Sequence, residues 1–406
     1  MGAVAELTVE LENPDVYQSG IPQDVFAYLR SHAPVHWSPA AADGGFWSVT
    51  TYPLVDEVSR NHELFSSARR DGGFRLFDEA DRHLLLPASI LSADGTEHAA
   101  HRRLMAQALS APTLARLKVG VKARARALVE AMLARRGPVD LVADFAAPLT
   151  MGTFLELIGA RPEDGDMFHR WACALVGDED PEYACDWEAL AKEVAAFAFS
   201  LWTQRATAPQ ADLISAFGSP EGQNAGVGFF DFLATLLVLI VAGNETTRNS
   251  LVGGALALAL NEDQLELAAN DGSIIRSVVQ EAVRWTSPIN HMRRTALADT
   301  SIGGQAIAAG ERVVIWYSSA NFDETRFVAP LRFDARRFVS AAAPEHIGFG
   351  VGAHRCIGRR LAEMQLQIAF EELLSHVREI RLLRPPRRLR SNFINGFKSL
   401  EVSLAA

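Results

Sequence analysis

An apolar stretch at residues 229–260 constrains the fold of this chain more than any other feature. It reads FFDFLATLLVLIVAGNETTRNSLVGGALALAL and is long enough to span a bilayer. Asp231, Asn244, Glu245, Arg248 and Asn249 interrupt it, and charge at the centre of a membrane helix is costly. A helix buried in the core of a large protein explains the stretch better, so we expect no membrane insertion.

The composition is that of an ordinary globular protein with a sizeable core. The chain has 406 residues, of which 49% are hydrophobic and 22% are charged. It contains no Pro/Gly/Ser-rich linker, no low-complexity tract and no internal repeat. We therefore expect a single domain over residues 1–406.

Charge and cysteine content exclude several classes of protein. The net charge of −10 argues against nucleic acid as the main ligand, because phosphate binding needs a basic face. Cys173, Cys185 and Cys356 are too few and too scattered for a disulfide framework. The N-terminal sequence MGAVAELTVELENP has no basic region followed by an apolar one, as a signal peptide would. These features predict a cytoplasmic protein.

Helical patterns dominate the rest of the chain. Residues 111–137, 272–288 and 356–377 each have helical periodicity, and the second helix is expected to stop before Pro288. Strand patterns are short: VHWSP and GFWSVT suggest a hairpin near residues 35–50, and RVVIWYS a strand at 312–318. Because βαβ alternation is missing, we expect a mainly α fold with small β-sheets instead of a doubly wound parallel sheet.

One cysteine stands in an unusual setting, the sequence FGVGAHRCIG at residues 349–358. A free cysteine is most often a small buried hydrophobe. Here Gly350, Gly352 and Gly358 permit backbone conformations and close approaches that side chains forbid. Cys356 lies where a helix is expected to begin, and N–H groups there stabilise a thiolate, as does adjacent Arg355. This setting predicts a deprotonated sulfur able to lie against a flat ligand.

Two other roles for Cys356 can be weighed. Zinc is a poor fit, because no second cysteine or histidine lies at finger-like spacing from it. A nucleophilic cysteine with His354 as its base remains open. Residues two apart near a helix start do not, however, naturally face one another.

The sequence FGVGAHRCIGRRLA resembles the haem-binding signature of the cytochrome P-450 superfamily, the haem-thiolate monooxygenases. The matching positions are Phe349, Gly350, Gly352, His354, Cys356, Gly358, Leu361 and Ala362. The resemblance implies a mainly α fold, shaped as a helical triangular prism with small β-sheets, that binds haem b (iron protoporphyrin IX). It implies that Cys356 is the iron ligand and that Phe349, Gly350, His354 and Gly358 surround the haem. A thiolate ligand favours O–O cleavage.

A second stretch, EAVR, is weak evidence alone, since Glu and Arg at this spacing commonly form an exposed pair. In the family the same pattern lies on a buried helix under the haem. The resemblance implies structural roles for Glu281 and Arg284. It also implies a third partner in the downstream segment PLRFDARRF (330–338), and Arg332 is our expectation for it.

The stretch AGNETTR at 242–248 places polar residues inside the apolar helix, where they cost free energy unless satisfied. It resembles the family pattern that runs above the distal haem face, where the glycine leaves room for oxygen. The resemblance implies that Glu245 and Thr246 form the acid–alcohol pair that relays protons to bound dioxygen. Many bacterial members have Asp at the first position. Because a carboxylate is kept, we expect proton delivery to survive the change.

Haem propionates need donors where they are buried. His98 and Arg102 lie at i,i+4 on one helical face, and the family uses this spacing for propionates. A plain surface pair is the alternative. By the family's spacing Arg294 is a better donor than Arg293, and the resemblance assigns His354 to the other propionate.

Electrons must come from another protein, because the chain has no GxGxxG fingerprint and no flavin domain. We expect a ferredoxin-type redox partner with a reductase. Arg103, Arg355, Arg359 and Arg360 are predicted to form a basic patch on the cysteine side for an acidic ferredoxin.

The pocket is expected to be apolar and to take an uncharged hydrophobic substrate. The expected lining residues are Phe74, Phe77, Leu86, Leu237, Val241, Ala242, Ile289, Asn290, Met292, Phe393 and Ile394. The stretches RWTSPINHMRRTALADTSIGGQ and SNFINGFKSL resemble members that act on terpenoid alcohols, sterol side chains or alkyl chains, which favours hydroxylation of an aliphatic C–H. Phe322 replaces an arginine that family members often have.

Three functions are consistent with these features. The first is a monooxygenase that uses dioxygen. The second is a peroxygenase, whose family representatives usually lack the acid–alcohol pair. The third is a haem-based binding or sensing module without turnover. The presence of Glu245 and Thr246 favours the monooxygenase.

Overall fold

The computed structural model describes residues 9–39, 44–77, 89–135, 137–210, 212–218 and 228–405. Its main helices are α1 (Gln23–His32), α2 (Tyr52–Arg60), α3 (Gly95–Ala108), α4 (Ala111–Ala134), α5 (Ala147–Ile158), α6 (Gly165–Val176), α7 (Trp187–Thr207), α8 (Leu213–Phe217), α10 (Phe229–Ile240), α11 (Thr246–Leu260), α12 (Glu262–Asn270), α13 (Ile275–Thr286), α14 (Tyr317–Ala320) and α15 (Arg359–His376).

The strands are short and form small sheets. They are β1 (Val35–Ser38), β2 (Phe46–Val49), β3 (Phe65–Ser66), β4 (Val139–Asp140), β5 (His291–Ala296), β6 (Thr300–Ile302), β7 (Gln305–Ile307), β8 (Arg312–Trp316), β9 (Glu379–Leu382), β10 (Arg387–Arg388), β11 (Phe397–Ser399) and β12 (Glu401–Ala405). The largest sheet has the order β1-β2-β8-β5-β3, and only its β2–β8 pair is parallel. The mainly α class with small sheets is thus confirmed.

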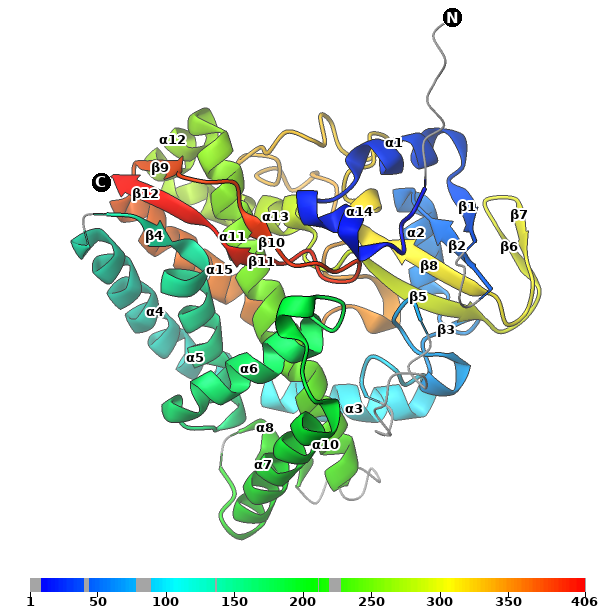
Figure 1. Cartoon of the computed structure of the whole chain (residues 1–406), viewed down its shortest axis with the longest axis horizontal. Coiled ribbons are helices and arrows are strands. Elements are labelled where there is room, and N and C mark those ends of the chain that lie inside the picture. The colour runs from blue at the N-terminus through cyan, green and yellow to red at the C-terminus, as the bar shows by residue number, and fades with distance from the viewer. Residues whose placement is uncertain are drawn as a thin grey trace, which may run out of the picture.

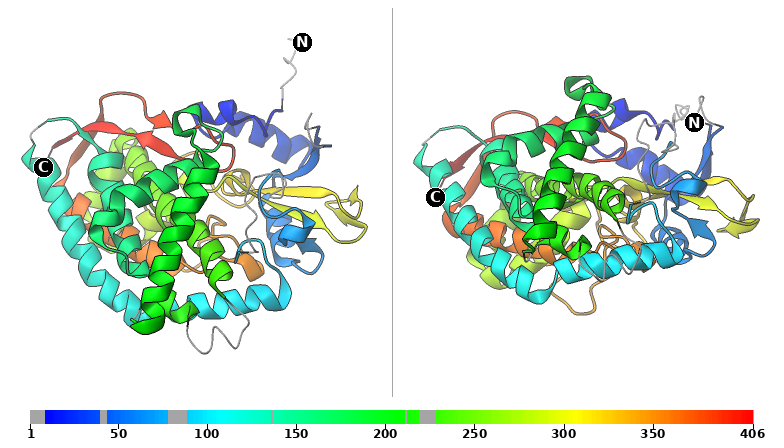
Figure 2. Two further views of the ribbon diagram at one scale, coloured as in Figure 1. Left: turned by 60° about the horizontal axis from the view of Figure 1, so that its bottom comes forward. Right: turned by 90° about the horizontal axis from the view of Figure 1, so that it is seen from below.

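The helices and the largest sheet occupy different parts of the molecule. Figure 1 shows α4, α5, α11 and α15 together on one side, and the sheet with α1 and α2 on the other. Seen from below, α3 and α4 run one after the other along the near side (Figure 2). Helices α11 and α13 pack closely. A Cβ added to Gly254 of α11 would lie only 2.7 Å from the Cβ of Ala282 on α13. Glycine at this position lets the two backbones approach.

The apolar stretch forms the interior of this arrangement, as predicted. Helix α10 continues through a π-helical turn, Val241–Glu245, into α11. Every residue from Thr247 to Leu258 is buried. Two segments, Leu141–Ile158 and Phe229–Leu260, are long and apolar enough to cross a membrane by length and composition alone. Both pack in the helical core, where burial explains their apolar character.

The other predicted elements are also found, with shifted ends. The helix expected at 111–137 ends at Ala134, and the one expected at 272–288 is a short 3-10 turn followed by α13. Helix α15 begins at Arg359, so Cys356 lies in the loop before it. Strands β1 and β2 pair antiparallel as the expected hairpin, and β8 occupies the third predicted strand.

Candidate active site

A cavity of about 650 Å³ lies between the cysteine loop and the centre of the long α10–α11 segment. Helix α3, strand β5 and the C-terminal segment around Phe393 complete its wall. Three sequence stretches that are far apart in the chain therefore meet at one place: FGVGAHRCIG, AGNETTR and HAAHR.

The cysteine loop is shaped by two glycines in the left-handed region. Gly350 has φ 64° and Gly352 has φ 71°, and a Cβ on Gly352 would lie 2.6 Å from the Ser59 carbonyl oxygen. The Cys356 N–H donates to the Phe349 carbonyl at 2.8 Å, which folds the loop back on itself. Phe349, Gly350 and Cys356 line the cavity, as do His354 and Gly358.

Cys356 lines the cavity, and its exposed surface faces it. Burial by the surrounding protein raises the pKa of the Cys356 thiol, and the backbone N–H groups of Gly358 and Arg359 together with the Arg102 guanidinium act in the opposite direction. These N–H groups belong to the start of α15, so the predicted helix-start donors are present. Both N–H groups point to the Cys356 sulfur.

The opposite wall is the π-helical turn, which widens the helix where it meets the cavity. Thr246 lines the cavity, and its Oγ1 donates to the Ala242 carbonyl at 2.8 Å. Asn244 turns inward instead: its Oδ1 accepts from Thr150 Oγ1 at 2.6 Å. The first three residues of the turn, 241–243, thereby line the cavity, whereas Asn244 and Glu245 are buried.

Glu245 does not line the cavity, although its neighbour Thr246 does. Its carboxylate is fully buried and forms an ion pair with Arg248, one turn along the same helix. Asn244 Nδ2 lies 3.4 Å from Glu245 Oε1. Burial raises the pKa of Glu245, and the Arg248 guanidinium opposes this shift. The predicted acid and alcohol are therefore adjacent in sequence but face different surroundings.

One rim of the cavity is basic. His98, Arg102, Arg294 and His354 all line it. The rings of His98 and His354 are 4.2 Å apart, and His354 Nε2 lies 3.3 Å from Asp94 Oδ1. Burial and the nearby positive charges of His354 and Arg102 lower the pKa of His98 to about 4. An anionic group bound among these side chains would be favoured.

Hydrogen bonding supports the same conclusion. Among the residues described, His98 Nε2 is buried and has no hydrogen-bond partner. Burial acts to raise the pKa of Asp94, but hydrogen bonds from His354 and Ser66 lower it to about 2, so it is ionised. Asp94 pairs with His354, and the rim with its buried, unpartnered His98 Nε2 fits the two propionate groups of a haem.

Strand alternation decides between the two candidate arginines of β5. Met292 and Arg294 are two residues apart and both line the cavity. Arg293 points to the other face, where its Nη2 lies 3.4 Å from the Asp71 carbonyl oxygen. The structure thus places Arg294 at the rim, as the sequence reading preferred.

Most of the predicted lining residues are in the cavity wall. They are Phe74, Leu237, Val241, Ala242, Ile289, Met292, Phe393 and Ile394. Two expectations were wrong. Phe77 packs against the N-terminal cluster that contains Leu76 and Trp316, and Asn290 is buried beside the cavity with its N–H bonded to the Phe393 carbonyl. Leu86 lies outside the described residues.

Comparisons with known proteins agree with this geometry. The cytochrome P450 family model matches residues 270–385. Linalool 8-monooxygenase of Pseudomonas putida is 39% identical over 97% of this chain and 98% of its own length. The chain belongs to the cytochrome P450 family. A steroid C26-monooxygenase of Rhodococcus jostii is 33% identical over 97% of this chain and 84% of its own length.

Solved structures show the same relationship. A Mycobacterium marinum cytochrome P450 in complex with pseudoionone matches with a TM-score of 0.89 and 31% identity, covering 99% of this chain and 100% of that one. A P450 from Novosphingobium aromaticivorans matches with a TM-score of 0.87 and 33% identity, covering 98% and 99%. This P450 is accordingly a monooxygenase, and proteins of its family bind haem b.

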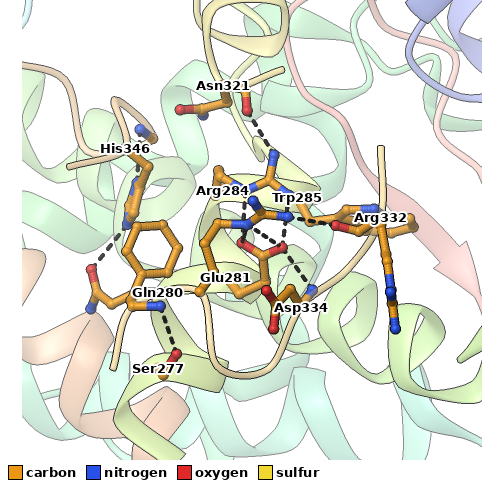
Figure 3. Close-up of polar contacts among 12 residues, drawn as sticks. Ser277, Gln280, Glu281, Arg284, Trp285, Asn321, Arg332, Asp334 and His346 are labelled. Atoms are coloured by element: carbon orange, nitrogen blue, oxygen red, sulfur yellow. Dashed lines mark hydrogen bonds and ion pairs between the residues drawn. The ribbon is translucent and has the colours of Figure 1, made fainter. Parts of the chain in front are cut away.

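The buried glutamate under the cysteine loop has a different partner from the one expected. Glu281 is fully buried, and both Arg284 nitrogens, Nε and Nη2, donate to it at 2.7 Å. Its third donor is Arg337, whose Nε lies 3.0 Å from both carboxylate oxygens. Figure 3 shows Glu281, Arg284 and Asp334 converging at this point.

The prediction of Arg332 was wrong. Its side chain is exposed and pairs with Asp263 at 2.9 Å. Both arginines belong to the segment 330–338, and the loop turns between them so that Arg337 enters the core. Arg337 also donates to the carbonyls of Val328 and Arg332, which ties the loop down around the glutamate.

The surroundings of Arg284 explain why Phe322 is acceptable at a position where family members often have arginine. Phe322 is buried, and the Arg284 guanidinium lies 5.2 Å from the centre of its ring. An aromatic face is a favourable neighbour for a guanidinium. A second arginine here would instead bring like charge beside Arg284.

Sequence reasoning missed three functional-site residues: Asp94, Arg248 and Arg337. Asp94 directly precedes α3 and accepts hydrogen bonds from the Ser67 and Ala68 N–H groups. Its placement at a helix start was visible in the sequence, but its pairing with His354 was not. Arg248 was noted as an interruption of the apolar stretch, and the i,i+3 spacing from Glu245 was the available signal.

Proposed function

We propose that this P450 hydroxylates an aliphatic C–H bond of a hydrophobic small molecule of the terpenoid, sterol or alkyl type. The supporting observation is that one cavity holds Cys356 on one wall, Thr246 on the opposite wall and an apolar lining between them. The matched relatives are named for linalool, steroids and methyl-branched lipids, which are molecules of this kind.

Cys356 would ligate the iron of haem b, and His98, Arg102, Arg294 and His354 would bind the propionates. Bound haem b supplies the activation of dioxygen. The protein's own residues supply orientation, exclusion of water and protons. The apolar wall from Leu237, Ile289 and Ile394 removes water from a hydrophobic substrate and holds it in the cavity.

Thr246 is the residue in position to hand a proton into the cavity. Its hydroxyl lies at the cavity surface and can accept a proton from one side while donating on the other. Glu245 is the adjacent acid, and burial raises its pKa, which makes the protonated form easier to reach. To deliver a proton, the Glu245 carboxyl group must leave Arg248 and turn toward the Thr246 hydroxyl.

Replacing Thr246 with Ala tests this role. We expect the variant to consume electrons but to form less product per electron, with the difference appearing as hydrogen peroxide. Thr246→Ser keeps the hydroxyl and is the matched control. Equal product per electron in wild type and Thr246→Ala would contradict the role. Full product formation from added peroxide in both variants would instead support a peroxygenase.

A ferredoxin-type protein with a reductase is the proposed source of electrons. Arg103 and Arg360 are exposed, and Arg360 lies in the first turn of α15, directly after the cysteine loop. Arg355 and Arg359 share the same acidic partner, Glu345, so they contribute less positive charge than the sequence suggested. Charge reversal of Arg360 and Arg103 should slow reduction by ferredoxin and flatten its salt dependence. Unchanged kinetics in stopped-flow reduction would contradict this surface.

A further inference from the structure

An ion pair lies in the cavity wall in addition to the basic rim. Arg75 Nη2 lies 3.2 Å from Asp178 Oδ1, and both residues line the cavity. The two side chains are only 13% and 15% exposed. Burying a pair of charges carries a desolvation cost that its Coulomb attraction barely offsets, so such a pair contributes little to stability. Its position in a substrate cavity points to recognition.

The pair is held from both sides. The Arg75 guanidinium lies 4.7 Å from the centre of the Phe393 ring, and the Arg293 N–H donates to the carbonyl of neighbouring Phe74 at 2.7 Å. These contacts fix the segment that carries Arg75 against strand β5 and the C-terminal segment. Arg75 therefore reaches the cavity from an anchored backbone.

The segment that carries Asp178 is anchored as well. Next to it, the Glu179 carboxylate accepts from the Asn392 N–H at 3.3 Å, and Asp180 accepts from the Arg390 N–H at 3.0 Å. Lys398 pairs with Asp180 at 2.6 Å. The two partners of the ion pair thus come from separate parts of the chain, and the C-terminal segment around Asn392 and Phe393 contacts both parts.

We propose that the Arg75–Asp178 pair is a binding site for a neutral hydroxyl group of the substrate, remote from the carbon that is oxidised. This deepens, and rests on, the proposed hydroxylation of a hydrophobic molecule. A hydroxyl can donate to the Asp178 carboxylate and accept from the Arg75 guanidinium at once. The positive charge of Arg75 and the negative charge of Asp178 offset one another, so a charged ligand gains no net attraction from the pair.

The test compares three ligands that share one branched chain: 3,7-dimethyloctan-1-ol, 2,6-dimethyloctane and 3,7-dimethyloctanoic acid. Dissociation constants are measured by the spin-state shift of the haem-loaded enzyme. We expect the alcohol to bind about tenfold more tightly than the alkane, as one or two hydrogen bonds allow. The acid should bind no better than the alcohol, because repulsion by Asp178 offsets attraction to Arg75.

Arg75→Met and Asp178→Asn should each reduce the preference for alcohol over alkane to about twofold or less, while alkane binding changes little. The matched control is Arg70→Met, which removes the same charge from an exposed position in the same segment. That control should keep the full preference. Unchanged alkane binding also shows that the variants are folded.

Equal binding of alcohol and alkane by wild type would overturn the inference, as would a preference that survives both substitutions. Tighter binding of the acid would overturn it too. In each of these cases the branched alkane can still be hydroxylated, so the proposed function stands. Failure of all three ligands to bind would overturn the inference together with the proposed substrate class.

Discussion

Two glutamate–arginine pairs of identical spacing lie on opposite sides of the cavity. Glu281 and Arg284 are on α13 under the cysteine loop, and Glu245 and Arg248 are on the long helix at the other wall. Both glutamates are fully buried, and both pairs are three residues apart in sequence. A motif search would treat them alike.

Their surroundings differ in the number of donors. Glu281 accepts from Arg284 twice and from Arg337, and the Asp334 N–H donates to it at 3.0 Å. Glu245 has Arg248 and a long contact with Asn244 at 3.4 Å, and the buried Arg248 Nε has no partner among the described residues. The first carboxylate is saturated, whereas the second can still change partners. A saturated network fixes structure, and an incomplete one is available for chemistry.

The largest effect should come from breaking the saturated pair. Arg337→Met leaves Glu281 with less positive charge in the core and frees the loop carbonyls that Arg337 holds. We expect a loss of about 3–5 kcal/mol of unfolding free energy, measured by urea titration. Arg332→Met removes an exposed arginine from the same loop and should change stability by about 0.5 kcal/mol or less. Similar losses in both variants would contradict the assignment of Arg337.

Breaking the incomplete pair should cost less. After Arg248→Met, the buried Glu245 can take up a proton, so the cost falls to that of burying a neutral polar group, roughly 1–3 kcal/mol. The loss should be greater at pH 8 than at pH 6, because an unpaired buried carboxyl group resists ionisation. Urea midpoints at the two pH values would show this, and a pH-independent loss would argue that Glu245 stays ionised.

Removing both charges of a pair should affect the unfolding free energy very differently in the two pairs. Glu245→Gln/Arg248→Met takes away a buried charge and its partner together, and we expect stability within about 1 kcal/mol of wild type. Glu281→Gln/Arg284→Met should remain strongly destabilised, because Arg337 and the Asp334 N–H keep facing a site that has lost its charge. Comparable stability of the two double variants would remove the distinction between the pairs.

The smallest effect is the pH dependence of Glu245 itself. Its folded-state pKa is raised, so between its ordinary and its raised value the folded protein binds more protons than the unfolded chain. Unfolding free energy should therefore fall as pH rises through that range. Glu245→Gln lacks this contribution, so its stability relative to wild type should improve as pH rises. Parallel pH curves for the two proteins would contradict the raised pKa.

The sequence read alone identified the features whose partners are close along the chain. The glycines around Cys356 report a backbone conformation directly, and φ values of 64° and 71° at Gly350 and Gly352 bear this out. The apolar stretch predicted a buried helix, and residues 247–258 are buried without exception. His98 and Arg102 share one helical face, and both reach the cavity rim.

Tertiary structure decided the contacts that join distant segments. Arg332 and Arg337 are five residues apart and equally able to reach Glu281 by side-chain length, and only the turn of the loop selects Arg337. The π-helical turn changes which side of the helix each residue occupies, so Thr246 faces the cavity and Glu245 faces Arg248. The Arg75–Asp178 pair joins residues 103 positions apart. Local spacing fixes backbone conformation and helix faces, but partners at such separations are set by packing, which the periodicity of a sequence does not encode.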